Sequence, residues 1–184
     1  IQSGIGKPSK FELMPPGLKI DQLPPQEHSQ KLLGLTSGTL QCSFIGRVTK
    51  IKRPDRFLDV VSEMKKRGIP IEFFMAGDGE LIEECRKRVQ LENLPVKILG
   101  WQTNIELVLS ASDIVILTSD NEGTPLSLIQ AGMAGKPVVS TNVGSVEDIV
   151  VTNVTGFVTS LEVTENADSL ERLVTNPELR AEIG

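Results

Sequence analysis

The sequence is poor in the side chains that dominate nucleic-acid sites. Its 184 residues include no tyrosine and one tryptophan, and aromatic residues make up only 4% of the chain. So few aromatic side chains argue against a surface on which successive bases would stack. The formal net charge is −5, which argues against a partner held by bulk positive charge. We therefore expect no nucleic-acid partner.

Cysteine and histidine are too scarce to build a disulfide framework, a metal centre or a catalytic triad. Cys42 falls in a predicted strand and Cys85 in a predicted helix, with no paired spacing between them. Both are predicted to be reduced thiols of a cytoplasmic protein. His28 is the single histidine and stands in a polar segment, where we expect it to be solvated. No metal ion and no cofactor are expected.

The chain also lacks long apolar runs. None approaches the about 20 residues of a membrane-spanning helix, and no secretory signal opens the sequence. The chain begins at Ile1 and ends at Gly184 directly after a predicted helix, so we expect a fragment of a longer protein. Its length suits one domain. Residues 1–30 are predicted to be a linker and the start of that domain, and residues 31–184 its body.

Helical and strand patterns alternate along most of the chain. The apolar runs predict strands at 39–45, 71–76, 96–99, 113–117, 137–141 and 155–158, with a further short strand at 11–14. Helical spacing predicts helices at 54–66, 79–90, 104–109, 167–174 and 177–183, and a short one near 32–35. Strands that alternate with helices through short connections indicate an α/β fold with a doubly wound, Rossmann-like parallel sheet.

The stretch 121–141, NEGTPLSLIQAGMAGKPVVST, predicts a loop, a helix, a tight turn and a strand. Thr124 suits the N-cap of the helix, and Pro125 suits its first position, where a missing N–H costs nothing. Leu126, Ile129 and Met133 recur at helical spacing and are predicted to form its buried face. The sequence therefore predicts an αβ unit at the centre of the domain.

Three residues of this stretch are candidates for ligand contacts. Glu122 lies just before the predicted helix, and Gln130 lies two turns inside it. Gly123 leaves room for a ligand to approach the backbone, and the free N–H groups at a helix start suit an anion. A glutamate in this place can also serve only to compensate the helix dipole, and a glutamine can simply border an apolar stripe.

A basic loop follows the first predicted strand of this acidic protein. Gly46 opens it, and Arg47 and Lys52 offer the cations that a diphosphate needs. Lys50 and Arg53 are interpreted as solvated. Because ligands of doubly wound sheets bind beyond the carboxyl ends of the strands, this loop is a candidate phosphate site. The alternative is a basic loop with no ligand.

Two glycine turns follow the next strands. Gly77 and Gly79 flank Asp78 after the second strand, and Gly100 precedes Trp101 after the third. Glycines there would let a nucleotide pass close to the backbone. The first turn could equally be a simple turn with Asp78 as the N-cap of the next helix, and Trp101 could be only a rim residue.

The chain from about residue 17 to about residue 156 resembles the retaining GT-B glycosyltransferases of group 1 (family 4), in their C-terminal, donor-binding domain. The resemblance rests on the basic GR…K loop, the GDG turn, the LG turn and a pattern like EGxPxxxxEAxAxGxPVV. Gln130 departs from this pattern, because the family has a second glutamate there. The matching positions of the pattern are Glu122, Gly123, Pro125, Ala131, Gly135, Pro137, Val138 and Val139.

The resemblance implies a role for each candidate residue. Arg47 and Lys52 would hold the donor's diphosphate and stabilise the leaving group, and Glu122 would contact the donor sugar. Gln130 would take the place of the glutamate that binds the ribose hydroxyls. Backbone near the glycine turns would contact the nucleotide and its base. The candidate binding residues are Gly46, Gly77, Gly79, Gly100, Trp101, Gly123, Thr124, Pro125, Leu126 and Gln130.

The resemblance also implies the reaction and its partners. The expected donor is a UDP- or GDP-sugar, and the expected acceptor is a saccharide or a lipid-linked saccharide bound through an N-terminal domain that this sequence does not contain. Polysaccharide or glycoconjugate biosynthesis is the implied setting, with peripheral membrane association of the full-length protein. The 184-residue chain by itself is expected to have little or no activity.

Two other functions are compatible with parts of the pattern. A nucleotide-sugar epimerase of the same architecture would need acid and base residues of its own. A receiver-like signalling domain would need acidic residues after the first strand, where this chain has Gly46 and Arg47. A dinucleotide-binding domain lacks support, because no G-x-G-x-x-G follows that strand.

Overall fold

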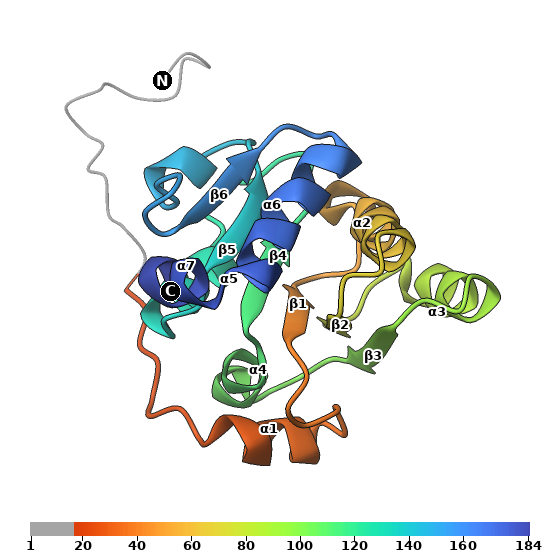
Figure 1. Ribbon diagram of the computed structural model, residues 1–184, viewed down its shortest axis with the longest axis horizontal. Coiled ribbons are helices and arrows are strands. Elements are labelled where there is room, and N and C mark those ends of the chain that lie inside the picture. The colour runs from red at the N-terminus through yellow and green to blue at the C-terminus, as the bar shows by residue number, and fades with distance from the viewer. Residues whose placement is uncertain (1–16) are drawn as a thin grey trace, which may run out of the picture.

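A computed structural model of the protein describes residues 17–184, and the strand predicted at 11–14 lies outside this range. Six parallel strands form a single sheet in the order β3-β2-β1-β4-β5-β6 (Figure 1). The predicted Rossmann-like α/β fold is confirmed. The strands are β1 Gln41–Ile45, β2 Glu72–Ala76, β3 Val96–Gly100, β4 Ile114–Leu117, β5 Val138–Thr141 and β6 Gly156–Thr159.

Helices cover both faces of the sheet. On one face, α2, α3, α6 and α7 share a core with alternate strand residues such as Phe44, Phe73 and Ile116. On the other face, α4 and α5 pack against the intervening strand residues Val115 and Leu117. The helices are α1 Gln26–Leu32, α2 Pro54–Lys66, α3 Ile82–Leu91, α4 Ile105–Ala111, α5 Leu126–Met133, α6 Val163–Thr175 and α7 Pro177–Ile183, with short 3-10 turns Lys50–Lys52 and Val146–Asp148.

Proline marks the helix starts that the sequence predicted best. Pro54 and Pro177 occupy the first turn of α2 and α7, and both helices have the predicted bounds. The short helix predicted near 32–35 is α1, which lies earlier, at Gln26–Leu32. It packs against α4, and Gln26 donates a hydrogen bond to Asp113, the residue just before β4. Helix α1 therefore packs on the body of the domain.

The predicted buried face of α5 is wrong. Leu128 and Ala131 are buried, whereas Leu126 and Met133 are 44% and 49% exposed. The helix has only eight residues, so two turns carry little periodic signal, and Leu126 faces a pocket instead of the core. Pro125 also takes the N-cap place that Thr124 was predicted to hold.

The cap predicted for α3 is also wrong. Its N-cap is Leu81, and Asp78 instead accepts a hydrogen bond from the backbone N–H of Gly79. The two cysteines are unpaired, as predicted; both are also buried, and burial raises the pKa of the Cys85 thiol to about 11. Within residues 17–184, no helix is long and apolar enough to cross a membrane.

Candidate functional site

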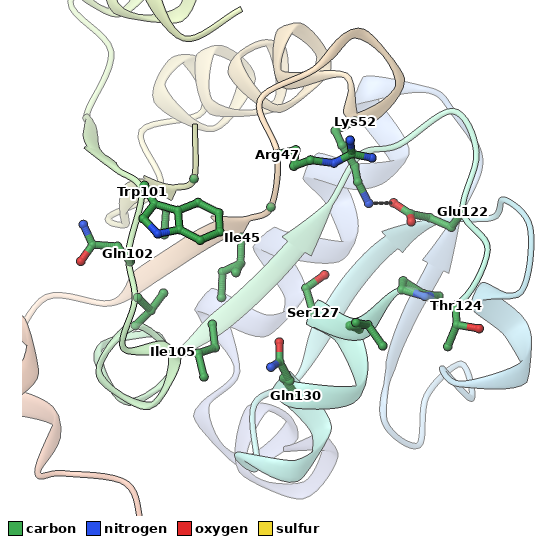
Figure 2. A pocket seen from close by; sticks show the side chains of 16 residues that line it. Ile45, Arg47, Lys52, Trp101, Gln102, Ile105, Glu122, Thr124, Ser127 and Gln130 are labelled. Atoms are coloured by element: carbon green, nitrogen blue, oxygen red, sulfur yellow. Dashed lines mark hydrogen bonds and ion pairs between the residues drawn. The ribbon is translucent and has the colours of Figure 1, made fainter. Parts of the chain in front are cut away.

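A pocket of about 480 Å³ opens where the strand order reverses, between β1 and β4. At this point the connections leave in opposite directions, so a crevice forms beyond the carboxyl ends of the strands. Figure 2 shows Trp101 and Glu122 on opposite sides of this pocket. Its lining residues are Ile45, Gly46, Arg47, Lys52, Ala76, Gly77, Trp101, Gln102, Ile105, Val108, Glu122, Thr124, Pro125, Leu126, Ser127 and Gln130.

Lys52 and Glu122 form an ion pair in the pocket wall. The Nζ atom of Lys52 lies 2.5 Å from Oε1 of Glu122, and the two side chains are 20% and 7% exposed (Figure 2). Lys52 ends the 3-10 turn after β1, and Glu122 lies in the loop after β4. Two loops about 70 residues apart in sequence thus meet at one charge pair. The sequence had predicted both residues as site residues, but nothing in it indicated their direct contact.

Arg47 and the start of α5 supply further groups that favour an anion. Arg47 is exposed, lines the pocket and has no ion-pair partner among residues 17–184. In the described chain, the N–H groups of Leu126 and Ser127 have no acceptor, whereas those of Leu128 and Ile129 bond to Pro125. Such free N–H groups and a nearby guanidinium are suited to phosphate oxygens.

Close backbone contacts explain the glycine that follows β2. Gly77 has a φ of 150°, and a Cβ placed on it would lie 1.8 Å from the carbonyl oxygen of Gly46. The Gly77 N–H donates to the carbonyl of Gly100, so the loops after β1, β2 and β3 pack together. This part of the pocket floor has no side chain between a ligand and the backbone.

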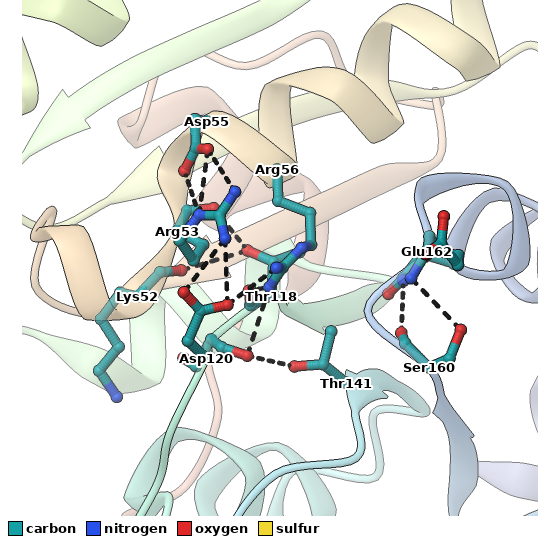
Figure 3. Close-up of polar contacts among 11 residues, drawn as sticks. Lys52, Arg53, Asp55, Arg56, Thr118, Asp120, Thr141, Ser160 and Glu162 are labelled. Atoms are coloured by element: carbon teal, nitrogen blue, oxygen red, sulfur yellow. Dashed lines mark hydrogen bonds and ion pairs between the residues drawn. The ribbon is translucent and has the colours of Figure 1, made fainter.

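The loop that carries Glu122 is held by a buried arginine. Arg56 of α2 is 5% exposed and donates hydrogen bonds to the carbonyl of Thr118 at 2.6 Å and to Asp120 at 2.8 Å (Figure 3). Arg53, predicted to be solvated, instead binds Asp55 and Asp120. Desolvation would raise the pKa of Asp120, but the hydrogen bonds from Arg56 and Arg53 hold it below its usual range.

Gly144, after β5, fits against this same loop. Its φ is 57°, and a Cβ there would lie 1.7 Å from the carbonyl oxygen of Glu122. Only glycine allows both that conformation and that approach. The Glu122 backbone is therefore fixed from two directions, by α2 and by the turn after β5.

Three of the predicted binding residues do not line the pocket. Gly79 packs against the backbone of Val48, Gly100 contributes only its carbonyl to the loop contact, and Gly123 faces open space. Several lining residues were not predicted from the sequence. Ile45 and Ala76 could have been found as the last residues of their strands, whereas Ile105, Val108, Gln102 and Ser127 carry no distinguishing signal.

The residues 17–184 contain no group of three or more His, Cys, Asp or Glu side chains that could hold a metal ion. The charge available to a bound anion comes from lysine, arginine and backbone N–H groups. Together, the sheet order and the pocket define an α/β domain with a crevice suited to a phosphate-bearing ligand.

Comparisons with known proteins agree with this class. The family model described as "Glycosyl transferases group 1" matches residues 26–184. A curated relative, the UDP-Gal:alpha-D-GlcNAc-diphosphoundecaprenol alpha-1,3-galactosyltransferase of Escherichia coli, is 28% identical over 163 residues, which cover 84% of this chain and 42% of that protein. The chain spans less than half the length of the curated relatives it matches.

Solved structures show the same architecture. A TarM variant of S. aureus, in complex with fondaparinux, alpha-GlcNAc-glycerol and UDP, has a TM-score of 0.78 and 26% identity, covering 90% of this chain and 33% of that one. The C-terminal domain of the group 1 family protein LpcC from Francisella tularensis has a TM-score of 0.76 at 21% identity, covering 86% of each chain, and supports the fold alone.

This chain belongs to the group 1 glycosyltransferase family. Its relatives include a poly(ribitol-phosphate) alpha-N-acetylglucosaminyltransferase of Staphylococcus aureus and a Vi polysaccharide biosynthesis protein of Salmonella typhi. Membership in this family does not favour the epimerase or the receiver-like alternative.

Proposed function

We propose that this chain is the C-terminal, donor-binding domain of a retaining group 1 (family 4) glycosyltransferase. The complete protein would transfer a sugar from a nucleotide-diphosphate donor to a saccharide or lipid-linked acceptor. One observation carries the proposal: Arg47, Lys52 and Glu122 meet the N-terminus of α5 in a single pocket at the switch point of the sheet. Few other ligands need two cations, free N–H groups and a carboxylate side by side.

The donor would lie across the pocket with its diphosphate near Arg47 and Lys52. These cations and the N–H groups of Leu126 and Ser127 would offset the charge that develops on the leaving diphosphate. Because the cations are the protein's own, the reaction needs no metal ion or cofactor. Glu122, on the α5 side, would bind hydroxyl groups of the transferred sugar.

The nucleoside would occupy the half of the pocket between Gln130 and Trp101. Figure 2 shows Gln130 on the α5 side and Trp101 on the opposite rim. The amide of Gln130 can donate to and accept from ribose hydroxyls, although it lacks the charge of a glutamate. Trp101, which is 69% exposed, offers a face on which the base can stack. A relative that uses UDP-Gal and a structural neighbour that binds UDP favour UDP over GDP.

The acceptor would bind mainly to a second, N-terminal domain. The low coverage of the relatives supports this arrangement. We also propose that the enzyme works in the cytoplasm, in keeping with its two buried, unpaired cysteines, and that the full-length protein associates peripherally with the membrane. The 184-residue chain should bind nucleotide sugars weakly and transfer no sugar, so measured turnover by this chain would contradict the proposal.

Calorimetry of the chain with UDP, GDP and ADP, and with UDP-glucose, UDP-galactose, UDP-N-acetylglucosamine and GDP-mannose, tests the donor site directly. We expect one nucleoside diphosphate to bind more tightly than the others, and Arg47→Ala to weaken that binding. Failure of all seven compounds to bind would overturn the proposed function.

A further inference from the structure

The carboxylate of Glu122 uses one oxygen for two donors. Both Nζ of Lys52 and Oγ of Ser119 lie 2.5 Å from Oε1. The other oxygen, Oε2, has no hydrogen-bond partner among residues 17–184. A carboxylate held this way has one oxygen committed to the protein and one available to a ligand.

The two donors differ in how firmly they are placed. Lys52 reaches the carboxylate through a long side chain that is 20% exposed. Ser119 is fully buried, and its carbonyl accepts a hydrogen bond from the hydroxyl of Thr141 on β5 at 2.7 Å. Arg56 approaches the same carbonyl at 3.5 Å. The hydroxyl of Ser119 therefore stands on backbone that β5 and α2 hold in place, whereas the ammonium of Lys52 stands at the end of a long, partly exposed side chain.

A diphosphate in the pocket would change which donors bond to Oε1 of Glu122. Its charge would attract Lys52 away from Glu122 and would repel the Glu122 carboxylate itself. Without Lys52, the remaining donor to Oε1 is Ser119. A neutral, buried hydroxyl keeps its hydrogen bond regardless of the charge that enters beside it.

We propose that Ser119 is a positioning residue for Glu122. It holds the carboxylate in place when the donor's diphosphate draws Lys52 away, so that Oε2 can accept a hydrogen bond from a hydroxyl of the donor sugar. This inference rests on the proposed function and adds a residue that acts on the sugar through Glu122 alone. Ser119 should therefore affect recognition of the sugar and leave recognition of the diphosphate unchanged.

The test compares two serine-to-alanine variants at opposite ends of β4. Ser119 follows the strand at the pocket, and Ser112 precedes it at the far edge of the sheet; both are 0% exposed and both donate side-chain hydrogen bonds. Ser119→Ala should weaken binding of the tightest sugar nucleotide of the calorimetric set about tenfold, the worth of one hydrogen bond to a charged group. Its affinity for the parent nucleoside diphosphate should stay within about twofold of the unchanged protein.

Ser112→Ala should lower the unfolding temperature about as much as Ser119→Ala does. It should leave the ratio of the affinities for the sugar nucleotide and the parent nucleoside diphosphate unchanged. Ser119→Thr, which keeps the hydroxyl, should restore most of that ratio. If Ser119→Ala weakens both ligands equally, or neither, Ser119 is structural and the inference is overturned. If the unchanged protein binds no nucleotide, the proposed function fails and the inference fails with it. If the unchanged protein binds nucleotide but the Ser119 variants behave otherwise than expected, only the inference fails.

Discussion

The two walls of the pocket are built differently. On the α5 side, Glu122 is 7% exposed, and its loop is fastened by Arg56, by Ser119 and by the close approach of Gly144. On the opposite side, Arg47 is exposed, and Trp101 is 69% exposed. One wall is ordered before any ligand arrives, whereas the other still has surface to bury. A wall of fixed geometry can orient a reacting group. A wall with exposed surface can gain binding affinity when a ligand buries that surface.

Removing the anchor of the ordered wall should have the largest effect. Arg56→Ala leaves the Thr118 carbonyl and Asp120 without their main donor. We expect a loss of about 3 kcal/mol in the free energy of unfolding, measured by urea denaturation. Arg67→Ala is the control, since its partners Glu63, Asp168 and Glu171 form a more exposed cluster, worth about 1 kcal/mol or less. Equal losses in the two variants would show that the ordered wall does not depend on Arg56.

Removing the cation of Lys52, which lies between the two walls, should lower ligand affinity more than it lowers the stability of the fold. Lys52→Met keeps the length and apolar stem of the side chain but offers nothing to a diphosphate. Calorimetry should show nucleoside diphosphate binding weakened about 10- to 100-fold. Lys50→Met provides the comparison, because Lys50 is exposed and does not line the pocket. The assignment of Lys52 to the diphosphate is wrong if the two variants bind alike.

Truncating the open wall should have a smaller effect, on affinity alone. Trp101→Ala should weaken nucleotide binding about fivefold, since stacking of a base on an aromatic ring contributes about 1 kcal/mol or more. The unfolding temperature should hardly change, because the side chain is mostly exposed. Leu91→Ala, at an exposed apolar residue away from the pocket, should change neither quantity. A large drop in stability for Trp101→Ala would mean that this wall is also structural.

Acid should loosen the ordered wall slightly. Because its two arginine partners depress the folded-state pKa of Asp120, the stabilisation is present above the ordinary value of 3.8 and is lost as pH falls through the lower folded value. Asp120 is 42% exposed, so we expect less than about 1 kcal/mol. Urea denaturation of the unchanged protein and of Asp120→Asn should give different free energies of unfolding at about pH 6, and the two should converge as pH falls through the lowered folded-state pKa of Asp120. A constant difference would exclude this linkage.

The sequence predicted the sheet well because buried parallel strands are short apolar runs between clear turn signals. Helix starts were predicted well where proline stands in the first turn, as at Pro54 and Pro177. The buried face of α5 was predicted wrongly. A helix beside a pocket presents apolar side chains such as Leu126 to the pocket as well as to the core. Periodicity does not distinguish the two surroundings.

The site was predicted in part for a related reason. Charged residues at strand ends, such as Lys52 and Glu122, stand out in sequence. Ser119, which bonds to Glu122, does not, because it is a small, common residue whose role depends on the direction of its hydroxyl. Arg53 and Arg56 look like any basic residues at a helix start until Asp120 is seen beside them. Those contacts join segments more than 60 residues apart, which no local pattern encodes.

Trp101 has a practical consequence. It is the sole tryptophan of a chain without tyrosine, and it lies on the rim of the pocket, mostly open to water. Ultraviolet emission excited at the red edge of indole absorption therefore comes from one place in this chain. Any compound that covers that ring should shift or quench its fluorescence. Occupancy of the pocket can therefore be followed by intrinsic tryptophan fluorescence, without an added label.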